Sequence, residues 1–480
     1  MTLSGGYSDK SLDAVIVGAG PNGLAAAITL ARSGQSVLLI EARDTVGGGV
    51  RSGQLTLPGF IHDICSAVHP LGVASPFFRS VPLSEYGLSW VYPDASLVHP
   101  LDDGTAVVLE RSVQETAANL GTDGGAYQRI MDPVVKNWQK LQEDLLGPLR
   151  IPPHYPLLMA RFGLSAIQPA YYFAKSHFKG SRARAVFAGL SAHSQLPLQE
   201  ILTTGYALMF GTMAHAVGWP VARRGSQAIS DALAAYFKSL GGEIRTGWEV
   251  KDIGELPASR SVLFDVTPRQ LLKIAGGRLP EGYKRRLARF RYGPGVFKVD
   301  YALSDAIPWK AAECRRSITV HIGGTLDEIA VAEAAVGKGE HPERPFVLLS
   351  QPSLFDPTRA PNGQQTVWAY CHVPNGSTVD MTARIEAQIE RFAPGFKDCI
   401  LARSVKYPMG MEEYNPNYIG GDINGGVQDM WQFFTRPVVS LDPYATPAKG
   451  IYLCSSSTPP GGGVHGMCGY YASQSVLRRK

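Results

Sequence analysis

The sequence of 480 residues predicts an α/β protein. Three observations indicate this fold class: a strand–helix–strand pattern with a glycine-rich turn in residues 13–41, helical periodicity between about residues 75 and 219, and four β-rich runs between residues 295 and 373. The first pattern predicts parallel strands, and the last predicts a largely antiparallel sheet. Because a chain of this length exceeds one compact core, we expect two or three domains.

The composition is that of an ordinary globular protein, with 45% hydrophobic and 18% charged residues. The formal net charge of +5 comes without a run of basic and aromatic residues, so nucleic acid is not an expected partner. The six cysteines form no CxxC pair, which predicts reduced thiols and no metal site. We find no signal peptide and no membrane-spanning stretch, and we expect a cytoplasmic protein.

Residues 13–41 read as a buried strand, a tight turn, a helix and a second strand. In the turn, Gly18 permits the change of direction, Gly20 lets a pyrophosphate approach the backbone, and Gly23 lets the helix pack close to the strand. The second strand ends in Glu41, where a carboxylate can hold ribose hydroxyls. A glycine turn before a helix can be purely structural, but these parts follow one another in the order of a dinucleotide-binding unit, which is the function that we predict.

The residues directly after this unit indicate which dinucleotide is bound. The run "EARDTVGGG" resembles the FAD-binding signature of the amine oxidase and phytoene desaturase superfamily, in which a second glycine pair supports the pyrophosphate of FAD. No second GxGxxG occurs, so we do not expect a separate NAD(P)H domain. Many members of the superfamily carry arginine directly after the glycine pair, whereas this chain has Gly49 there and Arg51 two places later.

The chain closes with a strand-like run, "GIYLCSSST", and a second glycine-rich turn, "PPGGGVHGM". In the superfamily, the last piece of the dinucleotide-binding domain is a strand that enters a glycine turn and a helix. The resemblance therefore implies that both glycine loops hold one FAD, from its two ends. It runs essentially end to end and is strongest to the phytoene desaturase-related branch that includes pyridine nucleotide-disulphide oxidoreductase domain-containing protein 2.

This resemblance implies a Rossmann-like FAD-binding domain built from discontinuous segments and a second, substrate-binding domain with a mixed or antiparallel sheet and a helical region. The FAD-binding domain is expected to comprise residues 1–75, 222–292 and 440–480, and the substrate-binding domain residues 76–221 and 293–439. A strand in "EVKDI" is expected near the adenine. The predicted cofactor-binding residues are Gly18, Gly20, Pro21, Asn22, Gly23, Glu41, Ala42, Arg43, Gly48, Gly49, Val250, Gly462, Gly463 and Val464.

The function that the resemblance implies is FAD-dependent hydride transfer between flavin N5 and a C–C bond of an apolar, isoprenoid-like or carotenoid-like substrate, as desaturase, saturase or isomerase. One alternative is an amine oxidase, which would place an aromatic pair and a lysine-held water before the flavin; Trp431, Phe433 and Tyr471 are the aromatic candidates. Another is a prenyl-binding carrier on the same fold, like the Rab GDP-dissociation inhibitors. The electron acceptor, oxygen or a quinone, and the oligomeric state stay open.

Flavin chemistry requires few side chains, so the sequence offers few catalytic candidates. His465 lies inside the last glycine loop and is the first candidate, while His69 and His193 are weaker ones. No pair of carboxylates has a spacing that supports acid–base work, and no metal site is expected. Residues 155–190 combine aromatic, aliphatic and basic side chains, as in either a core-facing helix pair or a basic amphipathic surface in peripheral contact with a membrane.

Overall fold

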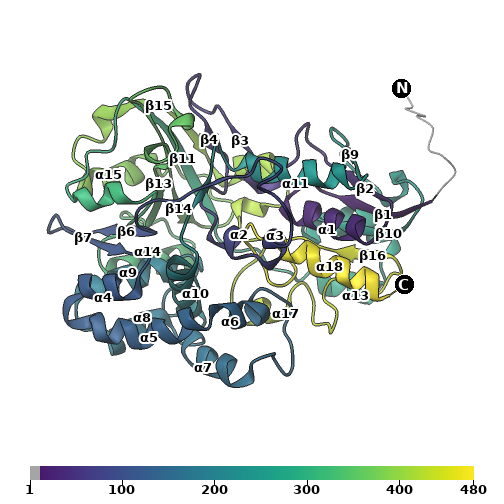
Figure 1. The fold of residues 1–480 in the computed structure, drawn as a ribbon, viewed down its shortest axis with the longest axis horizontal. Helices are drawn as coiled ribbons and strands as arrows, with labels where there is room; N and C mark the ends of the chain where they lie inside the picture. The colour runs from purple at the N-terminus through teal and green to yellow at the C-terminus, as the bar shows by residue number, and fades with distance from the viewer. Residues whose placement is uncertain (1–10, 480) are drawn as a thin grey trace.

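The computed structural model describes residues 11–479 and contains two large sheets, each in its own lobe (Figure 1). The first sheet has five strands in the order β16-β10-β1-β2-β9, and every neighbouring pair is parallel. Its strands are β1 (Leu12–Val17), β2 (Val37–Ile40), β9 (Glu243–Arg245), β10 (Ser259–Phe264) and β16 (Ile451–Leu453). They come from three distant parts of the chain, and the apolar side chains of the central strands are buried, as expected of a sheet covered on both faces.

Helices cover both faces of this sheet. Helix α1 (Pro21–Arg32) follows β1 directly, with proline at its first position, and packs against α11 (Gln227–Ser239) and α18 (Met467–Arg478). A Cβ atom at Gly469 would overlap the carbonyl oxygen of Asn22, so α18 can approach α1 this closely because residue 469 is glycine. Helices α12 (Pro268–Ala275) and α13 (Glu281–Leu287) pack with the other face, in a separate apolar cluster.

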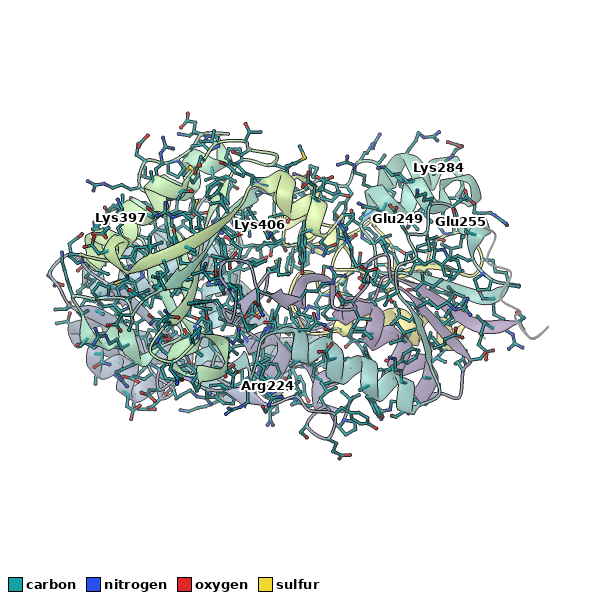
Figure 2. The ribbon with its side chains drawn as sticks, turned by 90° about the horizontal axis from the view of Figure 1, so that it is seen from above. Arg224, Glu249, Glu255, Lys284, Lys397 and Lys406 are labelled. Carbon is teal, nitrogen blue, oxygen red and sulfur yellow. The ribbon has the colours of Figure 1, made fainter. Side chains whose placement is uncertain are left out.

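The second sheet has seven strands in the order β15-β11-β14-β13-β12-β6-β7, and all neighbours are antiparallel except β12 and β6. These strands are β6 (Leu97–Pro100), β7 (Ala106–Leu109), β11 (Gly295–Leu303), β12 (Thr319–Ile322), β13 (Val347–Ser350), β14 (Gln365–Val373) and β15 (Ile400–Lys406). Helices α14 (Leu326–Gly337) and α15 (Thr382–Phe392) pack against it. Seen from above, Glu249 and Lys284 lie on the lobe of the first sheet, and Lys397 and Lys406 lie on the lobe of the second (Figure 2).

A helical region lies beside the second sheet. It consists of α4 (Val113–Asn119), α5 (Gly124–Lys136), α6 (Trp138–Leu145), α7 (Pro156–Ala166), α8 (Ala170–His177), α9 (Ser181–Ala192) and α10 (Thr203–Ala216). The shorter elements are β3 (Ser52–Gly53), β4 (His62–Asp63), β5 (Trp90–Val91), β8 (Val221–Ala222), α2 (Pro70–Ala74), α3 (Pro76–Arg79), α16 (Pro408–Tyr414) and α17 (Met430–Thr435). Within residues 11–479, no helix is long and apolar enough to cross a bilayer.

The predicted α/β fold class is confirmed, and one predicted strand is wrong. We expected a strand at 249–253, but the strand that extends the sheet is β9, which begins directly after the Gly241–Gly242 turn. The chain then turns at Gly247, whose φ of 69° is a conformation that glycine adopts without strain, and leaves the sheet. The five strands of the first sheet fall within the segments expected for the FAD-binding domain, while the domain boundaries themselves stay a prediction.

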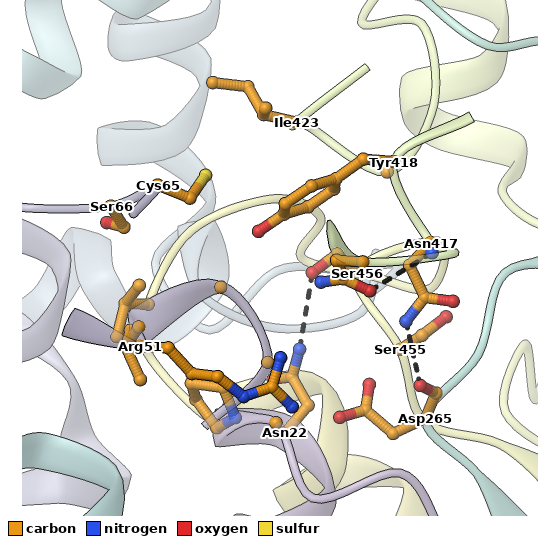
Figure 3. A pocket seen from close by; sticks show the side chains of 18 of the residues that line it. Asn22, Arg51, Cys65, Ser66, Asp265, Asn417, Tyr418, Ile423, Ser455 and Ser456 are labelled. Atoms are coloured by element: carbon orange, nitrogen blue, oxygen red, sulfur yellow. Dashed lines mark hydrogen bonds between the residues drawn. The ribbon is translucent and has the colours of Figure 1, made fainter. Parts of the chain in front are cut away.

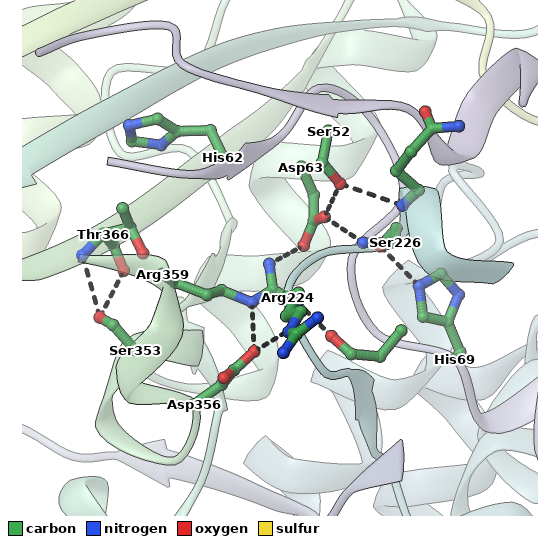
Figure 4. Close-up of polar contacts among 12 residues, drawn as sticks. Ser52, His62, Asp63, His69, Arg224, Ser226, Ser353, Asp356, Arg359 and Thr366 are labelled. Carbon is green, nitrogen blue, oxygen red and sulfur yellow. Dashed lines mark hydrogen bonds and ion pairs between the residues drawn. The ribbon is translucent and has the colours of Figure 1, made fainter. Parts of the chain in front are cut away.

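A buried ion-pair network joins the N-terminal segment to the second lobe (Figure 4). Arg359 is fully buried, pairs with Asp63 of β4 and with Asp356 at 3.1 Å, and donates to the carbonyl of Ala222 at 2.7 Å. Asp63 also accepts from the backbone N–H of Ser226 at 2.7 Å. Burial alone would raise the pKa of Asp63, but the Arg359 charge and the hydrogen bonds outweigh it and hold this pKa below its usual value.

Candidate functional site

A cavity of about 390 Å³ begins at the carboxyl ends of β1, β2 and β10 and continues to β13 and β14 of the second sheet (Figure 3). The carboxyl edge of a parallel sheet, where connections leave in opposite directions, is the usual ligand site of such folds. All of the predicted cofactor residues line this cavity except Gly23 and Gly462. The structure thus brings both glycine loops to one space, although no contact here tests their binding roles, which stay predictions.

The first glycine loop leaves no room for side chains. Gly18 has a φ of 103°, and a Cβ atom at Gly23 would overlap the carbonyl oxygen of Gly18. A Cβ atom at Gly20 would lie 2.8 Å from Oδ2 of Asp265, and one at Gly48 would lie 3.0 Å from the Cα of Gly20. The two N-terminal glycine turns therefore abut and form a shallow cradle that a methyl group would fill.

Glu41 is buried at 6% exposure and is held in place before any ligand binds. Its Oε2 accepts from the Ala19 N–H at 2.8 Å, and its Oε1 accepts from the Arg43 N–H and from Nη2 of Arg51, both at 3.0 Å. A carboxylate has about four acceptor positions, so one remains for a hydroxyl group. The position is the one expected for the carboxylate that holds a ribose.

The residue after the glycine pair, Gly49, lies against a tyrosine side chain. A Cβ atom at residue 49 would overlap the hydroxyl of Tyr418, so any side chain there would require Tyr418 to move. Arg51 instead turns toward Glu41 and forms an ion pair with it, and its guanidinium lies 5.6 Å from the ring centre of Tyr414. Arg51 therefore holds the Glu41 carboxylate in position.

Two amide side chains in the cavity wall indicate that the cavity binds a polar ligand. Oδ1 of Asn22 and Nδ2 of Asn424 are buried and have no hydrogen-bond partner among the described residues, and both residues line the cavity. Leaving a buried polar atom unpaired costs about 1–3 kcal/mol, so such atoms are normally paired with a ligand or with water. Together with the glycine cradle and Glu41, these groups fit a dinucleotide cofactor such as FAD.

Asp265 is a cavity residue that we did not predict as a cofactor contact. It follows β10 directly, is 8% exposed, and accepts a hydrogen bond from the Gly23 N–H at 3.0 Å. Burial raises its pKa to about 7, and the Glu41 charge adds to the rise against the hydrogen bonds from Gly23 and Gly20. The sequence offers one indication of this role: Asp265 is an acidic residue directly after a strand, β10, and β10 ends beside the Gly18 turn.

The other half of the cavity is apolar and aromatic. Its walls include Leu71, Phe210, Trp219, Leu348, Leu349, Trp368 and Tyr370. The rings of Trp368 and Tyr370 are stacked, with centres 5.4 Å apart and planes at 19°. The aromatic wall of Trp431, Phe433 and Tyr471 is wrong: none of them lines the cavity, and Trp431 is 77% exposed because the short helix α17 lies at the surface.

Two of the histidines considered from the sequence line the cavity. Nε2 of His193 lies 3.0 Å from Nε2 of His321, and the His193 ring stacks on Phe210. Burial, reinforced by His372, lowers the pKa of His193 to about 3. His69 contacts the Ser226 hydroxyl at 2.8 Å (Figure 4), and burial lowers its pKa to about 4. Both rings are therefore neutral at physiological pH.

His465, the first catalytic candidate, lies behind the cavity wall. It is 1% exposed and does not line the cavity, and burial lowers its pKa to about 4. Its Nδ1 accepts a hydrogen bond from the Met467 N–H at 3.0 Å, where helix α18 begins. This contact satisfies one of the free N–H groups at a helix start. A direct chemical role for His465 stays a prediction.

Lys298 is a further residue that we did not identify from the sequence. It lies on β11, is 2% exposed, forms an ion pair with Asp300, and lies 5.7 Å from the ring centre of Trp368 at the cavity wall. Burying two charges is costly unless they are paired, so such pairs are unusual inside a sheet. The signal was present in "VFKVDYAL", where two charges alternate with apolar residues in a strand.

Comparisons with known proteins agree with this geometry. Residues 16–80 match the model of the NAD(P)-binding Rossmann-like domain. The chain is 27% identical to pyridine nucleotide-disulfide oxidoreductase domain-containing protein 2 of Rattus norvegicus, over 97% of this chain and 93% of that protein. It is 26% identical to the neurosporene-forming phytoene desaturase of Rhodobacter capsulatus, over 95% and 92%.

Among solved structures, cyclohexylamine oxidase from Brevibacterium oxydans shares the fold, with a TM-score of 0.60 at 15% identity over 98% of this chain and 99% of that one. The likeness to the two sequence relatives thus extends over nearly the whole chain, and the fold is that of an amine oxidase. The chain is thus similar over nearly its whole length to oxidoreductases, among them pyridine nucleotide-disulfide oxidoreductase domain-containing protein 2 and a phytoene desaturase, and its N-terminal part matches a Rossmann-like dinucleotide-binding domain.

Proposed function

We propose that the protein binds FAD and transfers hydride between flavin N5 and a C–C bond of an apolar, isoprenoid-like substrate, as a desaturase, saturase or isomerase. The observation that carries the proposal is a single cavity in which the glycine loops and Glu41 form one end and an apolar, aromatic chamber forms the other. The relationship to phytoene desaturases supports the substrate class. Oxygen or a quinone is the proposed electron acceptor.

Bound FAD would supply a two-electron acceptor, and the chain would supply binding, orientation and a dry surrounding. Glu41 would hold the ribose, and the glycine cradle would admit the pyrophosphate. Trp248 and Val250, which line the far end of the cavity, would contact the adenine. Phe210 and Trp219 would exclude water from the reacting carbon atoms.

An amine oxidase is the second candidate. The stacked Trp368–Tyr370 pair and the buried Lys298 beside it favour this function, because an aromatic pair and a lysine are the features expected of such a site. A prenyl carrier that does not depend on FAD ranks third, because a carrier has no need of the abutting glycine turns or of the pre-oriented Glu41.

The visible spectrum of the purified protein, recorded before and after denaturation, tests the proposal. We expect an oxidised-flavin spectrum that bleaches when an apolar isoprenoid is added without oxygen, with octane as the unreactive apolar control. Bleaching by amines instead would select the amine oxidase. If no flavin is present even after incubation with FAD, the proposal is wrong and the carrier is favoured.

We also propose a peripheral membrane contact through helix α7, which lies at the lower edge of the molecule in Figure 1. Leu157 and Leu164 are seven residues apart on one face of α7 and are 89% and 73% exposed, with the exposed Arg161 between them. In contrast, α8 and α9 bury Phe173 and most of their other apolar side chains. An exposed apolar stripe with a basic residue is typical of a helix that lies in a lipid interface.

Replacing both leucines, as Leu157→Ser/Leu164→Ser, is expected to weaken binding to vesicles of phosphatidylcholine and phosphatidylserine by at least about tenfold, because each buried leucine contributes about 2 kcal/mol. Co-sedimentation with the vesicles measures this. Val331→Ser, at a 70% exposed site on α14, is the matched control and should bind like the unchanged protein. Equal binding by the double variant would contradict the role of α7.

A further inference from the structure

Asp265 directly follows strand β10, and its side chain lies against the start of helix α1 (Figure 3). Its backbone N–H donates to the carbonyl of Val17 at 2.8 Å, which places it beside the Gly18 turn at the same sheet edge. Its Oδ2 accepts from the Gly23 N–H at 3.0 Å. The residue that precedes α1 is Gly20, which has no side chain to cap the helix, so Asp265 supplies the cap from β10.

The start of this helix is also where the pyrophosphate of a dinucleotide is expected. A helix start carries about half a positive charge and a few free N–H groups, and it favours an anion there. The Asp265 carboxylate already uses one of these groups, and its Oδ2 reaches within 2.8 Å of the Cβ position of Gly20, where the backbone must admit the phosphates. A second, larger anion at the same place would be repelled by an ionised Asp265.

We propose that Asp265 couples the affinity for FAD to pH: its carboxylate occupies the pyrophosphate end of α1 and takes up a proton when FAD binds there. The inference rests on the proposed FAD binding and goes beyond it, because it assigns a proton to a residue that has no place in the dinucleotide signature. The proton moves from solvent to a carboxylate oxygen of Asp265, and no other bond changes.

The groups around Asp265 favour its neutral form. Glu41, at the end of β2, is the charged side chain that acts on it, and its charge raises the pKa of Asp265. Arg51 is directed to Glu41 rather than to Asp265. Burial raises the pKa of the thiols of Cys454, directly after β16, and of Cys468 on α18, so both thiols are neutral near Asp265.

The direction of the pH effect follows from linkage. The pKa of Asp265 is about 7 without the cofactor, and the negative pyrophosphate would raise it further. Below about pH 6 the residue is protonated in both states, so the affinity does not depend on its ionisation. Above about pH 7 the free protein must take up a proton to bind, and the dissociation constant rises by up to about tenfold per pH unit.

The test uses the apoprotein and FAD. We expect the dissociation constant, measured by quenching of flavin fluorescence, to be constant near pH 6 and to rise between about pH 7 and about pH 9. Calorimetry in two buffers of different ionisation enthalpy, near pH 8, should show uptake of up to one proton. The Asp265→Asn variant keeps an oxygen acceptor for the Gly23 N–H but cannot ionise, so its dissociation constant should not depend on pH and its proton uptake should disappear.

Asp103→Asn is the matched control, because Asp103 lies in the exposed turn between β6 and β7, where its carboxylate accepts from Thr105. It should retain the full pH dependence. Tight, pH-independent binding by the unchanged protein, without proton uptake, would overturn the role of Asp265 and leave the FAD proposal standing. Absence of FAD binding at any pH would overturn both. The measurement on the unchanged protein decides the question even if Asp265→Asn does not fold.

Discussion

Replacing Gly20 with valine is expected to abolish retention of FAD. The new Cβ would lie 2.8 Å from Oδ2 of Asp265 and 3.9 Å from the Cα of Gly48, and the two methyl groups beyond it would fill the cradle between the glycine turns. Overlap of this kind costs about 3 kcal/mol or more, which weakens binding by about a hundredfold or more. The ratio of flavin to protein absorbance in the purified variant measures the loss.

The matched control is Gly282→Val on α13, because a Cβ there would meet no atom within 4 Å and the backbone is helical. It should keep the flavin content of the unchanged protein. A Gly20→Val protein that folds, as judged by its circular dichroism, and still purifies with full flavin content would show that the pyrophosphate does not approach residue 20.

Replacing Arg359 with leucine is expected to lower the free energy of unfolding by about 3–5 kcal/mol. The change removes the positive charge that pairs with two buried carboxylates, Asp63 and Asp356, and leaves both with hydrogen bonds but without this countercharge. It also removes one of two hydrogen bonds to the Ala222 carbonyl, the one that joins the start of the β8–α11 segment to this network. Urea denaturation followed by tryptophan fluorescence measures the loss.

The loss should shrink at low pH. The pKa of Asp63 is held below its unfolded value, so the stability that its charge contributes is present above the unfolded pKa and is lost as pH falls through the folded one. Arg344→Leu is the control, because Arg344 is an exposed residue whose ion pair with Glu328, at 3.5 Å, lies at the surface and contributes less than about 1 kcal/mol. Equal effects of the two substitutions would contradict the structural role of Arg359.

Local patterns predicted the first βαβ unit, because its signals lie within thirty residues of one another. Apolar β-branched residues form β1, glycine permits the turn, and Pro21 starts α1. The alternating runs from residue 295 onward also became strands, of which β11 and β14 pair over their full lengths. Such elements are fixed by their own sequence.

The contacts that the sequence did not predict are long-range. Asp265 meets Gly23 across 242 residues, so no spacing rule connects them. Lys298 is buried because Asp300 and the Trp368 ring surround it, and burial of a lysine contradicts its usual exposure. Trp431 was an aromatic candidate of the amine oxidase alternative, but it lies on a short surface helix and is exposed. Tertiary packing decides each of these cases.

The strand order of the five-stranded sheet also sets an order of events during protein synthesis. A ribosome releases β1, α1 and β2 early, whereas the other neighbour of β1 in the sheet, β10, begins only at residue 259, and α18, which packs on α1, begins at residue 467. Until those segments emerge, the nascent chain exposes an apolar helix face and an unpaired strand edge, and chaperones bind such exposed surfaces. The lobe of the five-stranded sheet is thus begun before the second lobe is translated and completed only after it.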